Sequence, residues 1–177
     1  MAARVELSPS EGTQLLQAMA GVGVVELEGE RVTGAAGLTV TPTRHTLVLD
    51  GLALHTWCFI DAVGIPAAMG ADAMTRSTCG FCHAAIEVAF DAGEPRDEPA
   101  AVSWVPDKSC PSVRSEFCPE ANGFCSQDHL DAWRDQAGYP PGDVLTVAAV
   151  TALGRELWGC LRPLDDVLLT TKETTQP

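Results

Sequence analysis

The sequence has few basic residues, few aromatic residues and no long apolar run. Its 11 lysine and arginine residues stand against 24 aspartate and glutamate residues, a net charge of −13 at pH 7. Nucleic acids and anionic membrane surfaces both select basic surfaces, so we expect neither as a partner. No stretch of about 18 uncharged apolar residues is present, which excludes a transmembrane helix. Residues 1–12 contain no apolar signal-peptide core, and this predicts a cytoplasmic protein.

Cysteine, in contrast, is plentiful. The sequence has seven cysteines, an odd number, without an export signal. In a reducing compartment such cysteines are expected to remain thiols, as buried apolar side chains, metal ligands or nucleophiles. Six of the seven lie between Cys58 and Cys125, so we expect this part of the chain to carry the chemistry.

The hydrophobic pattern predicts an α+β fold with mixed or antiparallel sheets and flanking helices. A helix capped by Ser8 or Ser10 and ending at Gly21, followed by a hairpin, is expected at the start. Strands are predicted at 38–41, 46–49, 52–54, 73–77, 84–90, 101–105 and 144–150. Helices are predicted from Cys58, bent or stopped by Gly64 and Pro66, and at 126–137 and 151–161.

Three parts of the chain are predicted from this pattern. Residues 1–36 form a short helix-hairpin appendage that cannot bury a core alone. Residues 37–165 form the main domain, in which we expect the cysteine chemistry to lie. Residues 166–177 form a polar tail, for which we expect no packed structure.

Cys58 and Asp61 lie three residues apart, which places them on one face of a helix that begins there. Backbone N–H groups at a helix N-terminus lower the pKa of a thiol, so a thiolate beside a carboxyl group is predicted. The alternative is a buried core cysteine beside a capping aspartate.

The residues around this pair resemble those of the alkylmercury (organomercurial) lyase family in order and approximate spacing. The resemblance covers residues 37–161. It is carried by Leu54-His55-Thr56-Trp57-Cys58-Phe59-Ile60-Asp61, Ile65-Pro66-Ala67, Ser77-Thr78-Cys79 and Val113-Arg114-Ser115-Glu116-Phe117-Cys118.

The resemblance implies an enzyme that cleaves carbon–mercury bonds by protonolysis, giving a hydrocarbon and bound Hg(II). It implies that Cys58 and Cys118 are mercury-binding thiolates, that Asp61 delivers the proton and handles the metal, and that Cys79 has a structural role. No cofactor is implied for lysis. The implied partners are an organomercurial substrate, free thiols and a mercuric reductase that receives Hg(II).

Two features depart from the family pattern. The N-terminal part is shorter than the helical domain of the family, which affects the expected lid over the site. Three further cysteines match no working position of the family: Cys82, Cys110 and Cys125. Pro119, directly after Cys118, is expected to stiffen the loop.

The extra cysteines allow a different interpretation, a zinc site. Cys79 and Cys82 have the spacing of half a zinc ribbon, and Cys110 and Cys125 are further candidate ligands. His129, four residues after Cys125, is a further candidate, although a solvated helix position is the simpler reading. If Cys118 bound zinc, it could not also bind mercury. The alternative functions are therefore a zinc- or copper-binding protein without lyase activity, or an enzyme reusing the thiol–carboxyl pair on another substrate.

Overall fold

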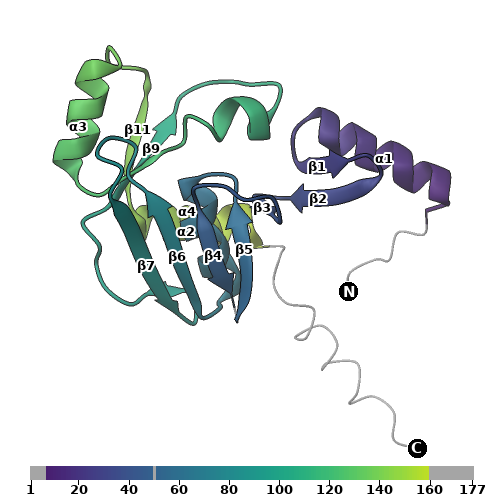
Figure 1. Ribbon diagram of the computed structural model, residues 1–177, viewed down its shortest axis with the longest axis horizontal. Helices are drawn as coiled ribbons and strands as arrows, with labels where there is room; N and C mark the ends of the chain where they lie inside the picture. Colours follow the sequence, from purple (N-terminus) through teal and green to yellow (C-terminus); the bar gives the residue numbers. More distant parts are fainter. Residues whose placement is uncertain (1–6, 50, 160–177) are drawn as a thin grey trace, which may run out of the picture.

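The computed structural model describes residues 7–49 and 51–159, arranged around an eight-stranded antiparallel sheet (Figure 1). In spatial order its strands are β1 (Val25–Glu28), β2 (Arg31–Ala35), β3 (Leu38–Thr39), β5 (Leu52–Thr56), β4 (Thr46–Leu49), β6 (Ala73–Thr78), β7 (Ala85–Asp91) and β8 (Glu94–Pro95). A smaller antiparallel sheet consists of β10 (Gly123–Phe124), β9 (Val102–Pro106) and β11 (Gly142–Thr146). The α+β expectation is therefore confirmed.

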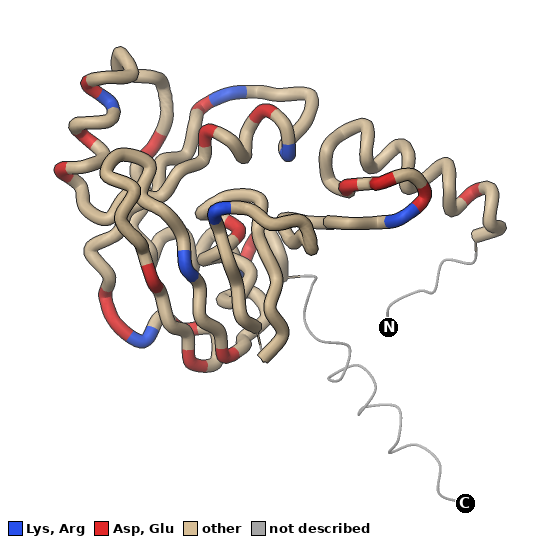
Figure 2. The backbone as a smooth tube through the Cα atoms, viewed as in Figure 1, with Lys and Arg blue, Asp and Glu red and all other residues tan. Residues whose placement is uncertain are grey.

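The helices are α1 (Pro9–Gly21), α2 (Phe59–Met69), α3 (Gln127–Gln136), α4 (Val147–Leu157) and one π-helical turn, η1 (Val113–Phe117). Helix α2 lies against β4 to β7 on one side and against α4 on the other. Among the described residues, no helix is long and apolar enough to cross a membrane. Acidic residues are spread over many elements rather than gathered in one segment (Figure 2).

The N-terminal helix and hairpin project to one side of the molecule (Figure 1). Ser8 caps α1 as expected, in a capping box with Glu11. The helix has no fully buried residue, but β2 pairs with β3, which in turn pairs with β5. The hairpin is thus continuous with the main sheet. The division of the chain into three parts stays a prediction, and residues 166–177 lie outside the described residues.

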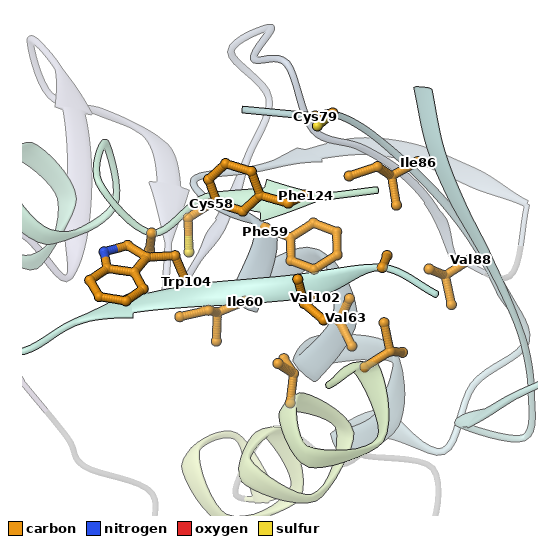
Figure 3. Packing of buried hydrophobic residues seen from close by; sticks show 14 of the residues in the cluster. Cys58, Phe59, Ile60, Val63, Cys79, Ile86, Val88, Val102, Trp104 and Phe124 are labelled. Atoms are coloured by element: carbon orange, nitrogen blue, oxygen red, sulfur yellow. The ribbon is translucent and has the colours of Figure 1, made fainter. Parts of the chain in front are cut away.

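Helix α2 continues through Gly64 and Pro66 to Met69, contrary to the expectation that these residues bend or stop it. A proline inside a helix costs about 3 kcal/mol. All residues from 59 to 68 are buried, and each large buried apolar side chain contributes about 1.5–3 kcal/mol. Burial therefore outweighs the local cost of the proline. Phe59, Ile60 and Val63 of α2 belong to the main core, together with Trp104 and Phe124 (Figure 3), whereas Ile65 packs in a smaller cluster with Leu47 and Leu49.

Residues 144–150 do not form one strand, as the apolar run had suggested. Strand β11 ends at Thr146, and α4 begins at Val147. The Thr146 side chain caps the helix by accepting a hydrogen bond from the Ala149 N–H group at 3.2 Å. A short apolar run cannot distinguish a buried strand from a buried helix, and here the threonine cap marks the boundary.

Helices α2 and α4 touch at two glycines, and we expect Gly154→Val to destabilise the protein. A Cβ atom at Gly154 would lie 2.3 Å from the Gly64 Cα atom. The backbone of α2 would have to move, so we expect the free energy of unfolding to fall by about 3 kcal/mol, near the upper end for overpacking. Urea denaturation measures this. Gly12→Ala is the control because nothing lies within 4 Å of its Cβ position. Equal stability of Gly154→Val and the parent protein would contradict the observed helix contact.

Candidate active site

Cys58, Asp61 and Cys118 come together in one buried site. Their ligand atoms all lie within 4.8 Å of one another. The exposed fractions of the three residues are 1%, 5% and 2%. Cys58 is the N-cap of α2, Asp61 lies in the first turn of this helix, and Cys118 directly follows η1. Cys58 lies beside Phe59 and Phe124 at the edge of the core (Figure 3).

Local hydrogen bonds orient the thiol and the carboxyl group at the start of α2. The Cys58 N–H group donates to Asp61 Oδ2 at 2.9 Å, so Asp61 closes the N-terminus of the helix. The Thr56 hydroxyl group donates to the Cys58 carbonyl oxygen at 3.1 Å. The backbone at Cys58 is extended, with φ −146° and ψ 178°, and the Cys58 side chain is buried.

Gly37 is a site residue whose role the sequence pattern did not reveal. Its φ is +94°, and a Cβ atom there would lie 2.7 Å from Asp61 Oδ1. Its carbonyl oxygen accepts a hydrogen bond from the Trp57 N–H group at 2.9 Å. Glycine thus allows β3 and the turn before it to approach the carboxyl group closely. Glycine adopts positive and negative φ about equally readily, so a single glycine in a sequence does not show which of the two its backbone adopts.

Burial raises the pKa of the Cys58 thiol well above its ordinary value, and the hydrogen bond with Cys118 and the charge of Asp61 act in the same direction. The expectation of a lowered pKa at the helix N-terminus is therefore wrong for the ligand-free protein. The free-energy cost of removing a thiolate from water exceeds the stabilisation that the N-terminus of the helix gives to its charge. The Cys58 thiol is therefore protonated at neutral pH in the ligand-free protein.

Burial also raises the pKa of Asp61, to about 7, although hydrogen bonds from Cys58 and the charge of Arg114 favour the carboxylate. A carboxyl group with this pKa exchanges protons near neutral pH, which suits a group that accepts and donates a proton in one reaction.

The raised pKa of Asp61 predicts a pH-dependent cost to stability. The folded protein holds this proton up to about pH 7, whereas the unfolded chain loses it near the ordinary value of 3.8. Protonated Asp61 therefore makes its whole contribution to the free energy of unfolding below about pH 4. This contribution is lost as the pH rises through about 7. Because one pKa unit corresponds to about 1.4 kcal/mol, we expect Asp61→Asn to be more stable than the parent by about 4 kcal/mol at pH 8. Urea denaturation at pH 8 and pH 3 measures the difference, which should nearly vanish at pH 3, below the pKa of the unfolded chain. A difference independent of pH would contradict the assignment.

Two cavities meet at Trp57. One, of about 440 Å³, is lined by Trp57, Arg114, Cys118, Pro119 and residues 42–45. The other, of about 280 Å³, is lined by Asp61 and by mostly apolar side chains that include Trp57, Val113 and Trp158. A larger cavity of about 610 Å³, between β8 and α4, has no cysteine in its lining and lies apart from this chemistry.

His45, which directly precedes β4, is a packed side chain rather than a surface residue. The His45 ring is buried, and its Nδ1 atom lies 2.9 Å from the Ser77 hydroxyl oxygen. Burial and, to a lesser extent, the positive charge of Arg44 lower the pKa of His45 to about 3. His45 is therefore neutral at physiological pH.

A second group consists of Cys79, Cys82, Cys125 and His129, whose ligand atoms also lie within 4.8 Å of one another. Among the described residues, Cys110 belongs to neither group, and His129, rather than Cys110, completes the second set. The two groups share no residue, so the structure separates the predicted zinc ligands from Cys118. Cys160 lies outside the described residues.

The fold and the site define a class of α+β proteins that hold two cysteine thiols and one carboxyl group in a buried pocket. The family model described as MerB: Alkylmercury lyase matches residues 38–159. The chain is 34% identical over 146 residues to an alkylmercury lyase of Streptomyces lividans, covering 81% of this chain and 63% of the relative. It is also 34% identical over 150 residues to an alkylmercury lyase of Bacillus cereus, covering 82% and 66%. The chain belongs to the alkylmercury lyase family.

A solved structure, the mercury-bound form of MerB2, has the same fold. The TM-score is 0.79 at 22% sequence identity, with 86% of this chain and 76% of that chain covered. The chain spans about two thirds of the length of the curated relatives that it matches.

Proposed function

We propose that the protein is a carbon–mercury lyase that cleaves organomercurials to a hydrocarbon and Hg(II). The observation that carries this proposal is the buried group of Cys58, Asp61 and Cys118, with all three ligand atoms within 4.8 Å of one another. Membership of the alkylmercury lyase family supports it.

The residue types suit this chemistry. Mercury(II) is a soft metal, and soft metals select thiolate over oxygen and nitrogen ligands. Two thiols supply two sulfur ligands, and a carboxyl group beside them supplies a proton. Holding these groups around one carbon–mercury bond replaces encounters in solution by effective concentrations that reach ~10⁵ M or more. The reaction then needs no cofactor.

The proposed reaction has three steps. The Cys58 sulfur first replaces the thiolate that carries the organomercurial, and the Cys58 proton leaves with that thiolate as a free thiol. Cys118 then binds the same mercury atom and gives its proton to the Asp61 carboxylate. The Asp61 carboxyl group finally protonates the carbon, so the electron pair of the carbon–mercury bond becomes that of the new C–H bond. Two cysteine protons are consumed, one in the hydrocarbon and one in the released thiol.

The cavity next to Asp61 is our candidate pocket for the organic group. It has a volume of about 280 Å³ and a mostly apolar lining that includes Trp57 and Trp158. The carbon to be protonated would lie between this pocket and the two sulfur atoms. The wider cavity beside Cys118, with Arg44 and Arg114 in its lining, is our candidate entrance for thiol carriers.

Removal of the product requires exchange, because Hg(II) held by two buried sulfurs is stable. We propose that free thiols in the cytoplasm take Hg(II) from Cys58 and Cys118 and restore both protons. A mercuric reductase is the proposed recipient.

The test uses reduced protein, excess free thiol and phenylmercury, with the released benzene measured by gas chromatography. We expect repeated turnover that ceases in Cys58→Ser. Tight mercury binding without any benzene would instead mean that the family scaffold holds metal without cleaving the substrate.

A further inference from the structure

A second site for a metal ion lies apart from the proposed lyase site. We propose that Cys79, Cys82, Cys125 and His129 bind one structural Zn²⁺ ion. The four ligand atoms lie within 4.8 Å of one another. This inference does not depend on lyase activity, because none of the four residues belongs to the group of Cys58, Asp61 and Cys118.

The sulfur–sulfur distance within the group is close to that of a tetrahedral zinc site. The Cys82 and Cys125 sulfur atoms are 3.6 Å apart, and the Cys125 sulfur lies 2.9 Å from His129 Nδ1. Zn–S bonds of about 2.3 Å in tetrahedral geometry place two sulfur atoms about 3.8 Å apart. Small side-chain rotations therefore suffice to admit the ion. The sulfur separation is also far longer than the bond of about 2.05 Å in a disulfide.

Two ordered backbone segments present the ligands in pairs. Cys79 and Cys82 lie in the turn between β6 and β7, where the Cys79 N–H group donates to the Ala84 carbonyl oxygen at 2.8 Å. Cys125 directly precedes the N-cap of α3, and His129 lies in the first turn of that helix, where its N–H group is bonded to Ser126. Cys-x-x-Cys is a ligand spacing typical of structural zinc sites, and Cys-x-x-x-His places its two ligands about one helical turn apart.

The backbone already joins these two segments. The Gly80 N–H group donates to the Gly123 carbonyl oxygen at 2.9 Å, and the rings of Phe81 and His129 pack with centroids 5.3 Å apart. The four ligands are therefore preorganised by contacts that do not require the metal. Preorganised ligands bind a metal more tightly because less conformational freedom is lost.

The donor set suits zinc and excludes hard cations. Three thiols and one imidazole offer sulfur and nitrogen, whereas Ca²⁺ and Mg²⁺ require oxygen ligands. Four protein ligands close the tetrahedral coordination sphere, which is the property of structural rather than catalytic zinc sites. Mercury in the proposed lyase site needs only two sulfur ligands, whereas the second group offers the four ligands that a structural zinc ion requires.

The position of the site explains what the ion would stabilise. The segment from Cys118 to Cys125 connects the second thiol of the lyase site to the proposed zinc ligands. Within it, the Ala121 carbonyl oxygen accepts from the Phe59 N–H group at 3.4 Å, beside Cys58. Zinc bound to Cys125 would fix one end of this segment to the β6–β7 turn.

The experiment measures metal content of the full-length protein purified from zinc-supplemented cells, by inductively coupled plasma mass spectrometry. We expect one zinc per chain that survives gel filtration in the parent and in Cys110→Ser, and loss of zinc in Cys82→Ser and His129→Ala. Cys110→Ser is the matched control because it removes a thiol outside both groups.

Cobalt substitution distinguishes a variant that has lost a metal ligand from a variant that has misfolded. We expect Co(II) to give the intense visible bands of a tetrahedral thiolate site, and His129→Cys to retain one metal ion with these bands altered. The proposal is overturned if the parent binds no zinc, if zinc is lost in Cys58→Ser rather than in Cys82→Ser, or if mass spectrometry finds a Cys82–Cys125 disulfide in the purified protein.

Discussion

We expect Cys58→Ser and Cys118→Ser each to lower the rate of benzene release from phenylmercury by at least about 10³-fold, because each removes one member of a cooperating catalytic group. Serine offers a hard oxygen in place of a soft sulfur, so it does not compete for mercury. Both positions are buried, and serine is nearly the same size as cysteine. At Cys58 serine is also a preferred N-cap residue, so we expect the fold to be retained.

The two variants differ in what they trap. In Cys118→Ser, Cys58 still captures the organomercurial, and we expect intact-mass spectrometry to show a persistent adduct that contains both mercury and the phenyl group. Cys110→Ser serves as the control and keeps the parent rate. Full activity of Cys118→Ser would show that a single protein thiol suffices and would remove the second thiol from the mechanism.

Asp61→Asn separates mercury capture from proton delivery. The asparagine oxygen can still accept the hydrogen bond that Asp61 Oδ2 accepts from the Cys58 N–H group, so the cap of α2 remains. The side chain no longer carries an exchangeable acidic proton, and general acid catalysis contributes about 10²–10⁴-fold. We therefore expect benzene release to fall by this factor while one phenylmercury per chain is still bound.

The control for this variant is Asp143→Asn, which changes an exposed carboxyl group in β11 and should leave the rate unchanged. Single-turnover measurement of benzene against protein-bound mercury distinguishes the two steps. A variant Asp61→Asn that releases benzene at the parent rate would mean that a cysteine proton reaches the carbon directly.

Local sequence signals predicted the parts of the fold that local chemistry determines. Ser8 and Ser126 mark the starts of α1 and α3 through side-chain caps that can be recognised from the sequence. The Trp-Cys-x-x-Asp block likewise predicted a helix that begins at Cys58, and Cys58 and Asp61 do lie at the start of α2. The strands of the central sheet were recognisable because their buried and exposed residues alternate, as in β7.

Features set by long-range packing were not predictable in this way. Pro66 remains inside α2 because α4 packs closely against Gly64, a contact between residues 90 positions apart. The raised pKa of Cys58 depends on how completely the rest of the chain covers it, which no spacing reveals. The partnership of Cys82 with Cys125 and His129 depends on how the β6–β7 turn meets the start of α3.

The most direct test of the proposed mechanism is a single turnover without free thiol. Reduced, metal-free protein is mixed with one equivalent of phenylmercury, and both the benzene and the protein-bound mercury are measured. If Cys58, Cys118 and Asp61 supply everything that the reaction needs, one benzene is released per chain and Hg(II) remains bound through the two cysteines. A stable protein–mercury–phenyl adduct, with benzene formed only after external thiol is added, would contradict this mechanism.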